Sequence, residues 1–176
     1  MDESELLRRS RRGDRDAFGQ LVARYQAPVY RVVRGILADE AECEDVAQEA
    51  FLRAYENIGR FRAESGFFTW LYRIAVNEAL RVRRKKASVT AGELPEAEAP
   101  RAPEEDGPTL ATLQRLLGRL PDDYRAILVL RDLEGLSYQD ISSTLDIPLG
   151  TVESRIFRAR QELRAMWRRM KETQAR

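Results

Sequence analysis

The segment GTVESRIFRARQELR, residues 150–164, combines four arginines with apolar residues at helical spacing. If the segment is a helix, Ser154, Arg155 and Arg158 lie together near its N-terminus, away from the apolar stripe. In the DNA major groove, Arg can bond guanine with two hydrogen bonds and Ser can bond several bases. The alternative is a solvated surface helix, which is the usual meaning of an isolated basic helix.

The residues before this segment favour the DNA-reading interpretation. Ser137 and Asp140, three residues apart, have the form of a capping box that opens a short helix ending near Leu145. The residues IPLG then break the chain, and Thr151 begins the longer basic helix. A short helix, a tight break containing Pro and Gly, and a longer basic helix are the order of a helix-turn-helix.

A second basic surface is predicted upstream. Arg73, Asn77, Arg81 and Arg84 are spaced by four, four and three residues, which places them on one helix face. The preceding FRAESGFFTW, residues 61–70, gathers aromatic rings around a glycine. Rings beside a basic face can stack unpaired bases, each worth about 1–3 kcal/mol, or hold an extruded base.

The alternative for these rings is the protein core. Phe61 and Trp70 are expected there, because a small domain needs large apolar residues. Phe67 and Phe68 are adjacent, so both cannot be buried in one direction.

An acidic face is predicted on the helix expected at residues 42–58, which precedes both basic regions in the sequence. It contains one leucine, and its members recur at helical spacing: Asp45, Gln48, Glu49, Leu52 and Glu56. Such a face is either solvated or a docking surface for a basic partner element.

The composition of the chain bounds the remaining possibilities. The 176 residues are 43% hydrophobic and carry a net charge of +1, with basic and acidic stretches that suggest two kinds of partner. With Cys43 as its one cysteine and no histidine, the chain cannot form an intrachain disulfide, and a zinc or iron site of the usual kind is excluded. The N-terminus lacks a signal peptide and no stretch approaches 18 apolar residues, so we expect a cytoplasmic protein.

A linker is predicted in the middle of the chain. Residues 87–109 hold four of the seven prolines and no aromatic residue. We therefore expect an all-α protein of two small helical domains, residues 1–88 and 110–176, joined by a flexible linker at 89–109 that holds them only loosely. Further helices are expected after a cap at Asp14 or Asp16, with Pro28 kinking or dividing the segment, and at 42–58, 69–86, 110–120 and 124–133.

Taken together, two long stretches resemble sigma factors of the extracytoplasmic-function type, the smallest sigma-70 class. DVAQEAFLRAYENIGRFRAESGFFTWLYRIAVN (45–77) is similar to the second conserved region of that family, a helical bundle. LPDDYRAILVLRDLEGLSYQDISSTLDIPLGTVESRIFRARQELR (120–164) is similar to the fourth, a helix-turn-helix domain. The fragments SGFFTWLYRIAVN and GTVESRIFRAR resemble the envelope-stress branch in particular.

The resemblance implies a protein that binds core RNA polymerase, directs it to promoters and helps open the DNA, without catalysis, cofactor or metal. By position, the surface that docks on the largest polymerase subunit would comprise Asp45, Gln48, Glu49, Leu52 and Arg53. The minus-ten element would be bound by Phe61, Ser65, Phe67, Phe68, Arg73, Asn77, Arg81 and Arg84. The minus-thirty-five element would be read by Thr151, Glu153, Ser154, Arg155, Phe157 and Arg158.

Three positions in the basic helix qualify this assignment. Glu153 stands where many relatives have Arg or Lys, which removes a contact to DNA. Arg160 and Arg164 are expected to face phosphate or solvent rather than bases.

The family also implies partners and leaves rivals to test. The second-largest polymerase subunit, promoter DNA and an anti-sigma factor, which is often membrane-anchored, are the expected partners. An exposed Leu52 on the acidic face would suit such an anti-sigma factor. The rivals are a helix-turn-helix repressor that dimerises on a palindrome, and a nuclease, for which no catalytic residues are found.

Overall fold

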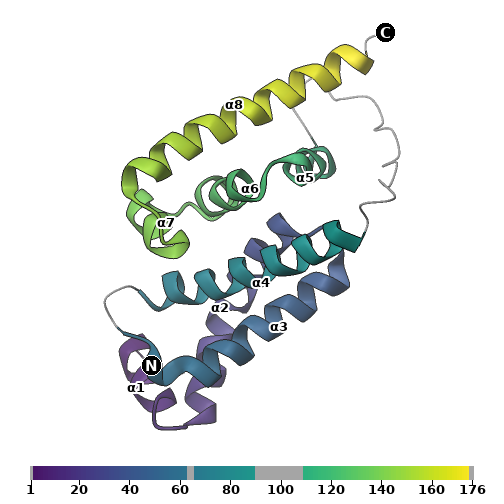
Figure 1. Ribbon diagram of the computed structural model, residues 1–176. Coiled ribbons are helices and arrows are strands. Elements are labelled where there is room, and N and C mark those ends of the chain that lie inside the picture. The colour runs from purple at the N-terminus through teal and green to yellow at the C-terminus, as the bar shows by residue number, and fades with distance from the viewer. Residues whose placement is uncertain (1, 63–65, 90–108, 175–176) are drawn as a thin grey trace.

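The computed structural model describes residues 2–62, 66–89 and 109–174, and no strand occurs in these ranges (Figure 1). The first part of the chain forms α1 (Glu3–Ser10), α2 (Arg15–Ile36), α3 (Glu40–Asn57), a 3₁₀ turn η1 (Ile58–Arg60) and α4 (Phe67–Val89). The second part forms α5 (Leu110–Arg119), α6 (Asp122–Leu128), a π-helical turn η2 (Val129–Leu133), α7 (Tyr138–Leu145) and α8 (Leu149–Gln174).

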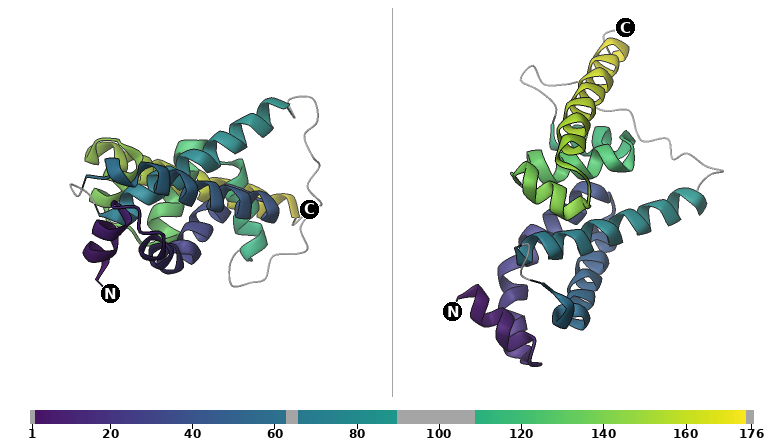
Figure 2. Two further views of the ribbon diagram at one scale, coloured as in Figure 1. Left: turned by 90° about the horizontal axis from the view of Figure 1, so that it is seen from below. Right: turned by 60° about the vertical axis from the view of Figure 1, so that its left-hand side comes forward.

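The helices are arranged as two halves that lie against each other. Helices α1–α4 form one half and α5–α8 the other, and the long α8 lies on the far side of the second half from the first (Figures 1 and 2). The predicted all-helical fold with two helical parts is confirmed. In the described ranges, no helix combines the length and apolar character needed to cross a membrane.

Several helices begin where side chains cap their free backbone N–H groups. The Asp14 carboxylate accepts from the Ala17 N–H at 3.0 Å, so Asp14 rather than Asp16 caps α2. The Ser137 hydroxyl accepts from the Asp140 N–H at 3.1 Å and donates to the Asp140 carboxylate at 2.6 Å. The predicted start of α7 is therefore correct, and its end at Leu145 is also as predicted.

Several features of the helices differ from the sequence-based expectations. Pro28 does not divide α2, although it lacks the N–H that would bond the preceding turn. The buried side chains that follow it (Val29, Val32, Val33, Ile36) hold the rest of the helix in the core. Helix α1 was not predicted, and α8 begins at Leu149, two residues before Thr151, where backbone N–H groups bond the Pro148 carbonyl.

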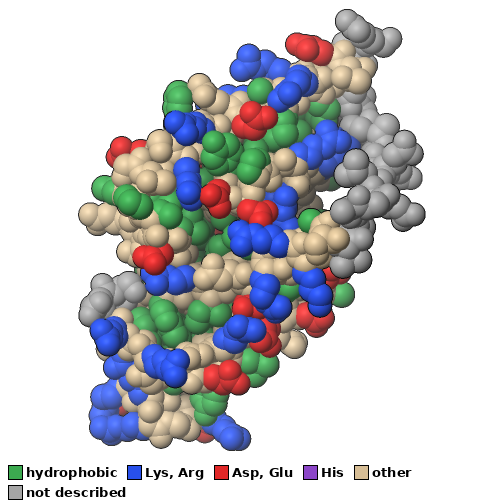
Figure 3. Space-filling view, in the orientation of Figure 1, with side chains coloured by type: hydrophobic (Ala, Val, Ile, Leu, Met, Phe, Trp, Pro, Cys, Tyr) green, Lys and Arg blue, Asp and Glu red, His purple; other side chains and the backbone are tan. Residues whose placement is uncertain are grey.

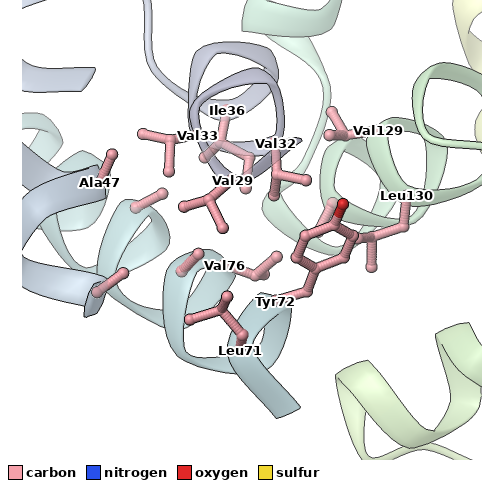
Figure 4. Close-up of a cluster of buried hydrophobic side chains, with 14 of the residues drawn as sticks. Val29, Val32, Val33, Ile36, Ala47, Leu71, Tyr72, Val76, Val129 and Leu130 are labelled. Atoms are coloured by element: carbon pink, nitrogen blue, oxygen red, sulfur yellow. The ribbon is translucent and has the colours of Figure 1, made fainter. Parts of the chain in front are cut away.

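The two halves share one apolar core. Side chains of α2 and α4 meet Val129 and Leu130 of η2 in a single cluster (Figure 4). Gly35 is required at this contact, because a Cβ there would lie 2.6 Å from a methyl carbon of Val129. Burial of apolar surface therefore joins the halves directly, in addition to the linker that was expected to hold them only loosely.

Polar contacts also cross between the halves. Arg31 on α2 bonds both oxygens of Glu134 at 2.8 and 2.9 Å, and the Glu134 side chain is only 4% exposed. The Arg125 guanidinium enters the boundary and donates to the Ile36 carbonyl at 2.6 Å. Burial, reinforced by the nearby charge of Arg83, lowers the pKa of Arg125 to about 9. We call this packing of the two halves the closed arrangement.

Candidate nucleic-acid interface and docking face

The N-terminal part of α8 presents the predicted base-reading residues on its outer side. Val152, Ile156 and Ala159 are buried against the preceding helices. Phe157 is 63% exposed and Arg158 is also exposed. We call the six predicted residues the recognition face: Thr151, Glu153, Ser154, Arg155, Phe157 and Arg158.

Members of the recognition face differ in how strongly the protein itself holds them. Arg155 is half-buried, and its guanidinium lies 3.2 Å from the Asp123 carboxylate. The Ser154 hydroxyl donates to the Thr151 carbonyl at 3.1 Å, a weak local bond that a base edge can replace. Glu153 and Arg158 are exposed. Both are therefore free to meet an approaching DNA groove.

Arg160 lies outside the recognition face and has a structural partner. Its Nε donates to the Asp132 carboxylate of η2 at 3.2 Å, and this bond raises its pKa. Arg160 thus pairs with a carboxylate, which was not predicted, while 40% of its side chain remains exposed to solvent, as expected. Arg164 is exposed, as expected of a solvated residue.

Helix α4 brings the second basic set to one side, which we call the basic face: Arg73, Asn77, Arg81 and Arg84. Asn77 is exposed, and Arg81 pairs with Glu78 at 2.9 Å. Two other members contact the second half: Arg73 donates to the Ser143 carbonyl and Arg84 pairs with Asp122 at 2.9 Å. The closed arrangement therefore occupies part of the basic face. Figure 3 shows Lys and Arg side chains with Asp and Glu beside many of them in the band between the halves.

The aromatic residues before α4 are packed more deeply than a base-stacking surface requires. Phe61 and Phe67 are 4% and 1% exposed, with ring centroids 5.7 Å apart, and Trp70 lies 5.3 Å from Phe61. The Arg11 guanidinium covers the Phe61 ring at 5.4 Å. Phe61 therefore lies in the core, as expected for a large apolar residue of a small domain, and neither ring offers an open face in this arrangement. Both rings pack in the hydrophobic core instead. Contact of Phe61 and Phe67 with the minus-ten element stays a prediction.

The other predicted aromatic contacts have different positions. Phe68 is half-buried and packs edge-on against Tyr72 at 6.0 Å, so the adjacent phenylalanines do point in different directions. Trp70, expected in the core, is half-buried. Ser65 lies outside the described residues.

Helix α3 gathers the five predicted docking residues on one side, which we call the docking face: Asp45, Gln48, Glu49, Leu52 and Arg53. Leu52 is 60% exposed although it is apolar. Arg53 donates from Nε to Glu49 at 2.7 Å, and this hydrogen bond is the main cause of its raised pKa. Leu52 is a single exposed apolar residue among charged side chains, and the docking role of this face stays a prediction.

Comparison with known proteins decides the family. The model of Sigma-70 region 2 matches residues 21–89, and that of Sigma-70, region 4 matches residues 110–163. The chain is 42% identical to the RNA polymerase sigma-H factor of Pseudomonas aeruginosa, covering 92% of this chain and 91% of the relative. It is 39% identical to the ECF RNA polymerase sigma-E factor of Escherichia coli strain K12, covering 93% of each.

The chain is an extracytoplasmic-function sigma factor. As such it acts in transcription initiation, where it binds core RNA polymerase and gives it promoter recognition. The repressor alternative is therefore set aside.

Solved structures match the fold of the chain over most of its length. CnrH in complex with the cytosolic domain of CnrY matches with a TM-score of 0.73 and 28% identity, over 92% of this chain and 94% of that one. The sigma factor RpoE in complex with the anti-sigma factor NepR, from Bartonella quintana, matches in fold with a TM-score of 0.69 and 23% identity, over 86% and 96%.

Sequence reasoning missed the charged residues buried between helices of this sigma factor. Glu78, Arg125 and Glu134 each hold partners from other helices. Arg31 and Glu134 are 103 residues apart, so no local pattern announces their contact. The one available signal was a charged residue at an otherwise apolar helical position, as at Arg125 in RAILVL.

Proposed function

We propose that three surfaces of this sigma factor place core RNA polymerase on a promoter. The docking face of α3 binds the largest polymerase subunit, the basic face of α4 binds the minus-ten element, and the recognition face of α8 reads the minus-thirty-five element. The roles follow the resemblance of each motif to the family. They divide the work so that acidic residues meet polymerase and basic residues meet DNA.

One observation carries the proposal furthest. The second helix of the helix-turn-helix buries Val152 and Ile156 and leaves Phe157 and Arg158 projecting from the same turns. A helix held by one side and open on the other has the geometry needed to enter a major groove. Exposure of a phenylalanine there supports contact with a thymine methyl group, the apolar feature of that groove.

Transcription in vitro with core polymerase and a promoter library tests the proposal. We expect the purified chain to direct initiation from a restricted promoter set with both elements, and the set to change when the recognition face changes. Initiation that is independent of the chain would overturn the function. Promoter choice that ignores all three surfaces would overturn their assignment.

The free chain is expected to bind promoters weakly. In the closed arrangement Arg73 and Arg84 contact the second half, and each half offers only a small basic surface. A gel shift without polymerase checks this. Tight, promoter-specific binding by the chain alone would contradict the proposed dependence on polymerase.

An anti-sigma factor is the proposed regulator. The matching CnrH and RpoE structures each hold another protein, CnrY and the anti-sigma factor NepR respectively. The exposed Leu52 on the docking face supports a protein partner at this surface when polymerase is absent. A pull-down from unstressed cells should recover such a protein, membrane-anchored or not. Recovery of polymerase alone would contradict the idea.

The proposed place of action is the cytoplasm, at the nucleoid, during an envelope-stress response. We also propose that the chain catalyses no reaction of its own, because its roles are binding and positioning. Incubation of the chain with DNA and divalent metal should leave the DNA intact. Cleavage would revive the nuclease alternative.

A further inference from the structure

A carboxylate buried between α3 and α4 joins two surfaces that the proposed function treats separately. The Glu78 side chain is 8% exposed. Its Oε1 lies 2.9 Å from Nη1 of Arg53, on the docking face, and its Oε2 lies 2.9 Å from Nη2 of Arg81, on the basic face. Arg53 also reaches Glu49 at 2.7 Å. Two carboxylates and two guanidinium groups therefore form one continuous network.

The burial of Glu78 makes this network sensitive to the loss of any member. A buried carboxylate needs nearby positive charge, and its interactions are stronger than those of exposed pairs because little water screens them. Arg53 and Arg81 are each roughly half exposed, so their outer parts remain available to partners. The Asn57 amide donates to the Arg53 carbonyl at 2.8 Å and fixes the backbone beneath.

Because Arg53 and Arg81 share the Glu78 carboxylate, a change at one arginine alters how tightly the other is held. While Arg53 neutralises part of the Glu78 charge, Arg81 is held less tightly and can turn toward a phosphate. Without Arg53, Arg81 becomes the one remaining guanidinium within the described network that balances Glu78, and the uncompensated carboxylate repels DNA phosphates. The state of the docking face is thus felt at the basic face through Glu78.

We propose that Glu78 is a positioning residue that couples polymerase docking to minus-ten binding by holding Arg53 and Arg81 together. The inference rests on the proposed roles of the docking and basic faces. It predicts that Arg53, which does not lie on the basic face, affects DNA opening in a way that passes through Arg81.

The test is promoter opening by the full chain bound to saturating core polymerase, measured by permanganate reactivity of unpaired thymines. Saturation removes the direct effect of Arg53 on docking. We expect Arg81→Ala to reduce opening, and Arg53→Ala to reduce it by about fivefold, the size of a typical coupling between neighbouring residues. Glu78→Gln, which keeps the shape and removes the charge, should restore opening in the Arg53→Ala chain.

The controls separate coupling from general damage. Arg8→Ala breaks an exposed arginine–carboxylate pair with Glu5 on α1, away from the network, and should leave opening unchanged. Thermal unfolding of each variant checks that it folds. A structural role of Arg53 alone would leave its effect intact in the Glu78→Gln background, and that result overturns the coupling.

The outcomes also distinguish this inference from the proposed function. If Arg81→Ala leaves opening unchanged, the assignment of the basic face fails. If Arg81→Ala impairs opening but Arg53→Ala at saturating polymerase does not, the assignment stands and the coupling through Glu78 is wrong.

Discussion

Arg158 is an exposed residue of the recognition face, and α8 holds its backbone in place. We expect Arg158→Ala to weaken promoters that depend on the upstream element by about 1–3 kcal/mol, the value of one good base contact. Arg164→Ala, on the same helix and also exposed, is the matched control. Transcription across the library measures both. If both variants lose the same amount of transcription from these promoters, Arg158 does not contact bases specifically.

Glu153 brings the one negative charge of the recognition face toward DNA. Glu153→Arg replaces repulsion of phosphates by attraction, so we expect stronger binding with a steeper salt dependence. The measurement is promoter affinity of the holoenzyme at several salt concentrations. Unchanged affinity would mean that Glu153 points away from DNA in the complex.

The stability of the folded chain should depend on alkaline pH through the phenol group of Tyr72. Burial, followed by the nearby Glu134 carboxylate, raises the pKa of Tyr72 from 10.0 to about 12. The folded chain therefore holds the phenolic proton more tightly than the unfolded chain. The contribution of Tyr72 to stability is complete below its ordinary pKa and is lost as pH rises through about 12.

Comparison with Tyr72→Phe isolates this effect from that of Arg125, whose lowered pKa acts in the opposite direction. We expect the stability difference between the unchanged chain and the variant to be smaller near about pH 11 than near about pH 8. Thermal unfolding at both pH values measures it. A stability difference that does not change with pH would mean that Tyr72 has the same pKa in the folded and the unfolded chain.

Among the helices, α3 has one side that stabilises the fold and another that is proposed to bind polymerase. Its inner side is buried, whereas Leu52 is 60% exposed. Leu52→Ala should change the free energy of unfolding by less than about 0.5 kcal/mol. It should nevertheless weaken binding to core polymerase, because it removes apolar area from the docking face. Urea unfolding and polymerase titration together check the prediction. A large loss of stability would show that Leu52 packs internally.

Elements with local signals were predictable from the sequence. The Ser137 cap, the break at IPLG and the apolar spacing of α8 all act within a few residues, and they place α7 and α8 within about two residues of the observed bounds. The apolar stripe of α2 was also visible, but its continuity through Pro28 was not. That continuity depends on packing of Val29 and Val32 against other helices, which a local rule on proline cannot include.

For the candidate surfaces, the sequence predicted which residues share a side of a helix but not how deeply each is buried. Helical spacing grouped the basic face of α4 and part of the other two faces, because periodicity decides which residues share a side. The family resemblance added Arg53, Thr151, Glu153 and Phe157. Spacing did not decide how deeply each side chain is buried, and Phe67 is the clear case: the resemblance assigned it to the DNA surface, but it packs against Tyr25, Phe61 and Trp70. Depth depends on contacts between distant residues.

For the whole molecule, the closed arrangement should respond to loss of its ion pairs. Arg31→Ala leaves the buried Glu134 carboxylate with a long contact of 3.5 Å to the Tyr72 hydroxyl. We expect the packing of the halves to weaken by about 1–3 kcal/mol, the value of hydrogen bonds to a charged group. Small-angle scattering should then show a larger radius of gyration. Arg8→Ala, within α1, should leave the radius unchanged.

A second variant tests the apolar part of the same boundary. Gly35→Ala would place a methyl group against Val129 at a distance that no normal contact allows. Because α2 can keep its helix with alanine, the expected result is separation of the halves rather than unfolding of the first half. Unchanged scattering from both variants would mean that other contacts dominate the closed arrangement.

The shared core of the two halves has a consequence for synthesis on the ribosome. Val129, which covers Gly35, emerges only after the whole first half and the following segment have been made. At roughly 5–20 residues per second, the sides of α2 and α4 that face η2 stay uncovered on the order of seconds. During that interval the nascent chain has no second half to occupy Arg73 and Arg84. A newly made first half therefore exposes this apolar surface and these two arginines until the finished protein closes on itself.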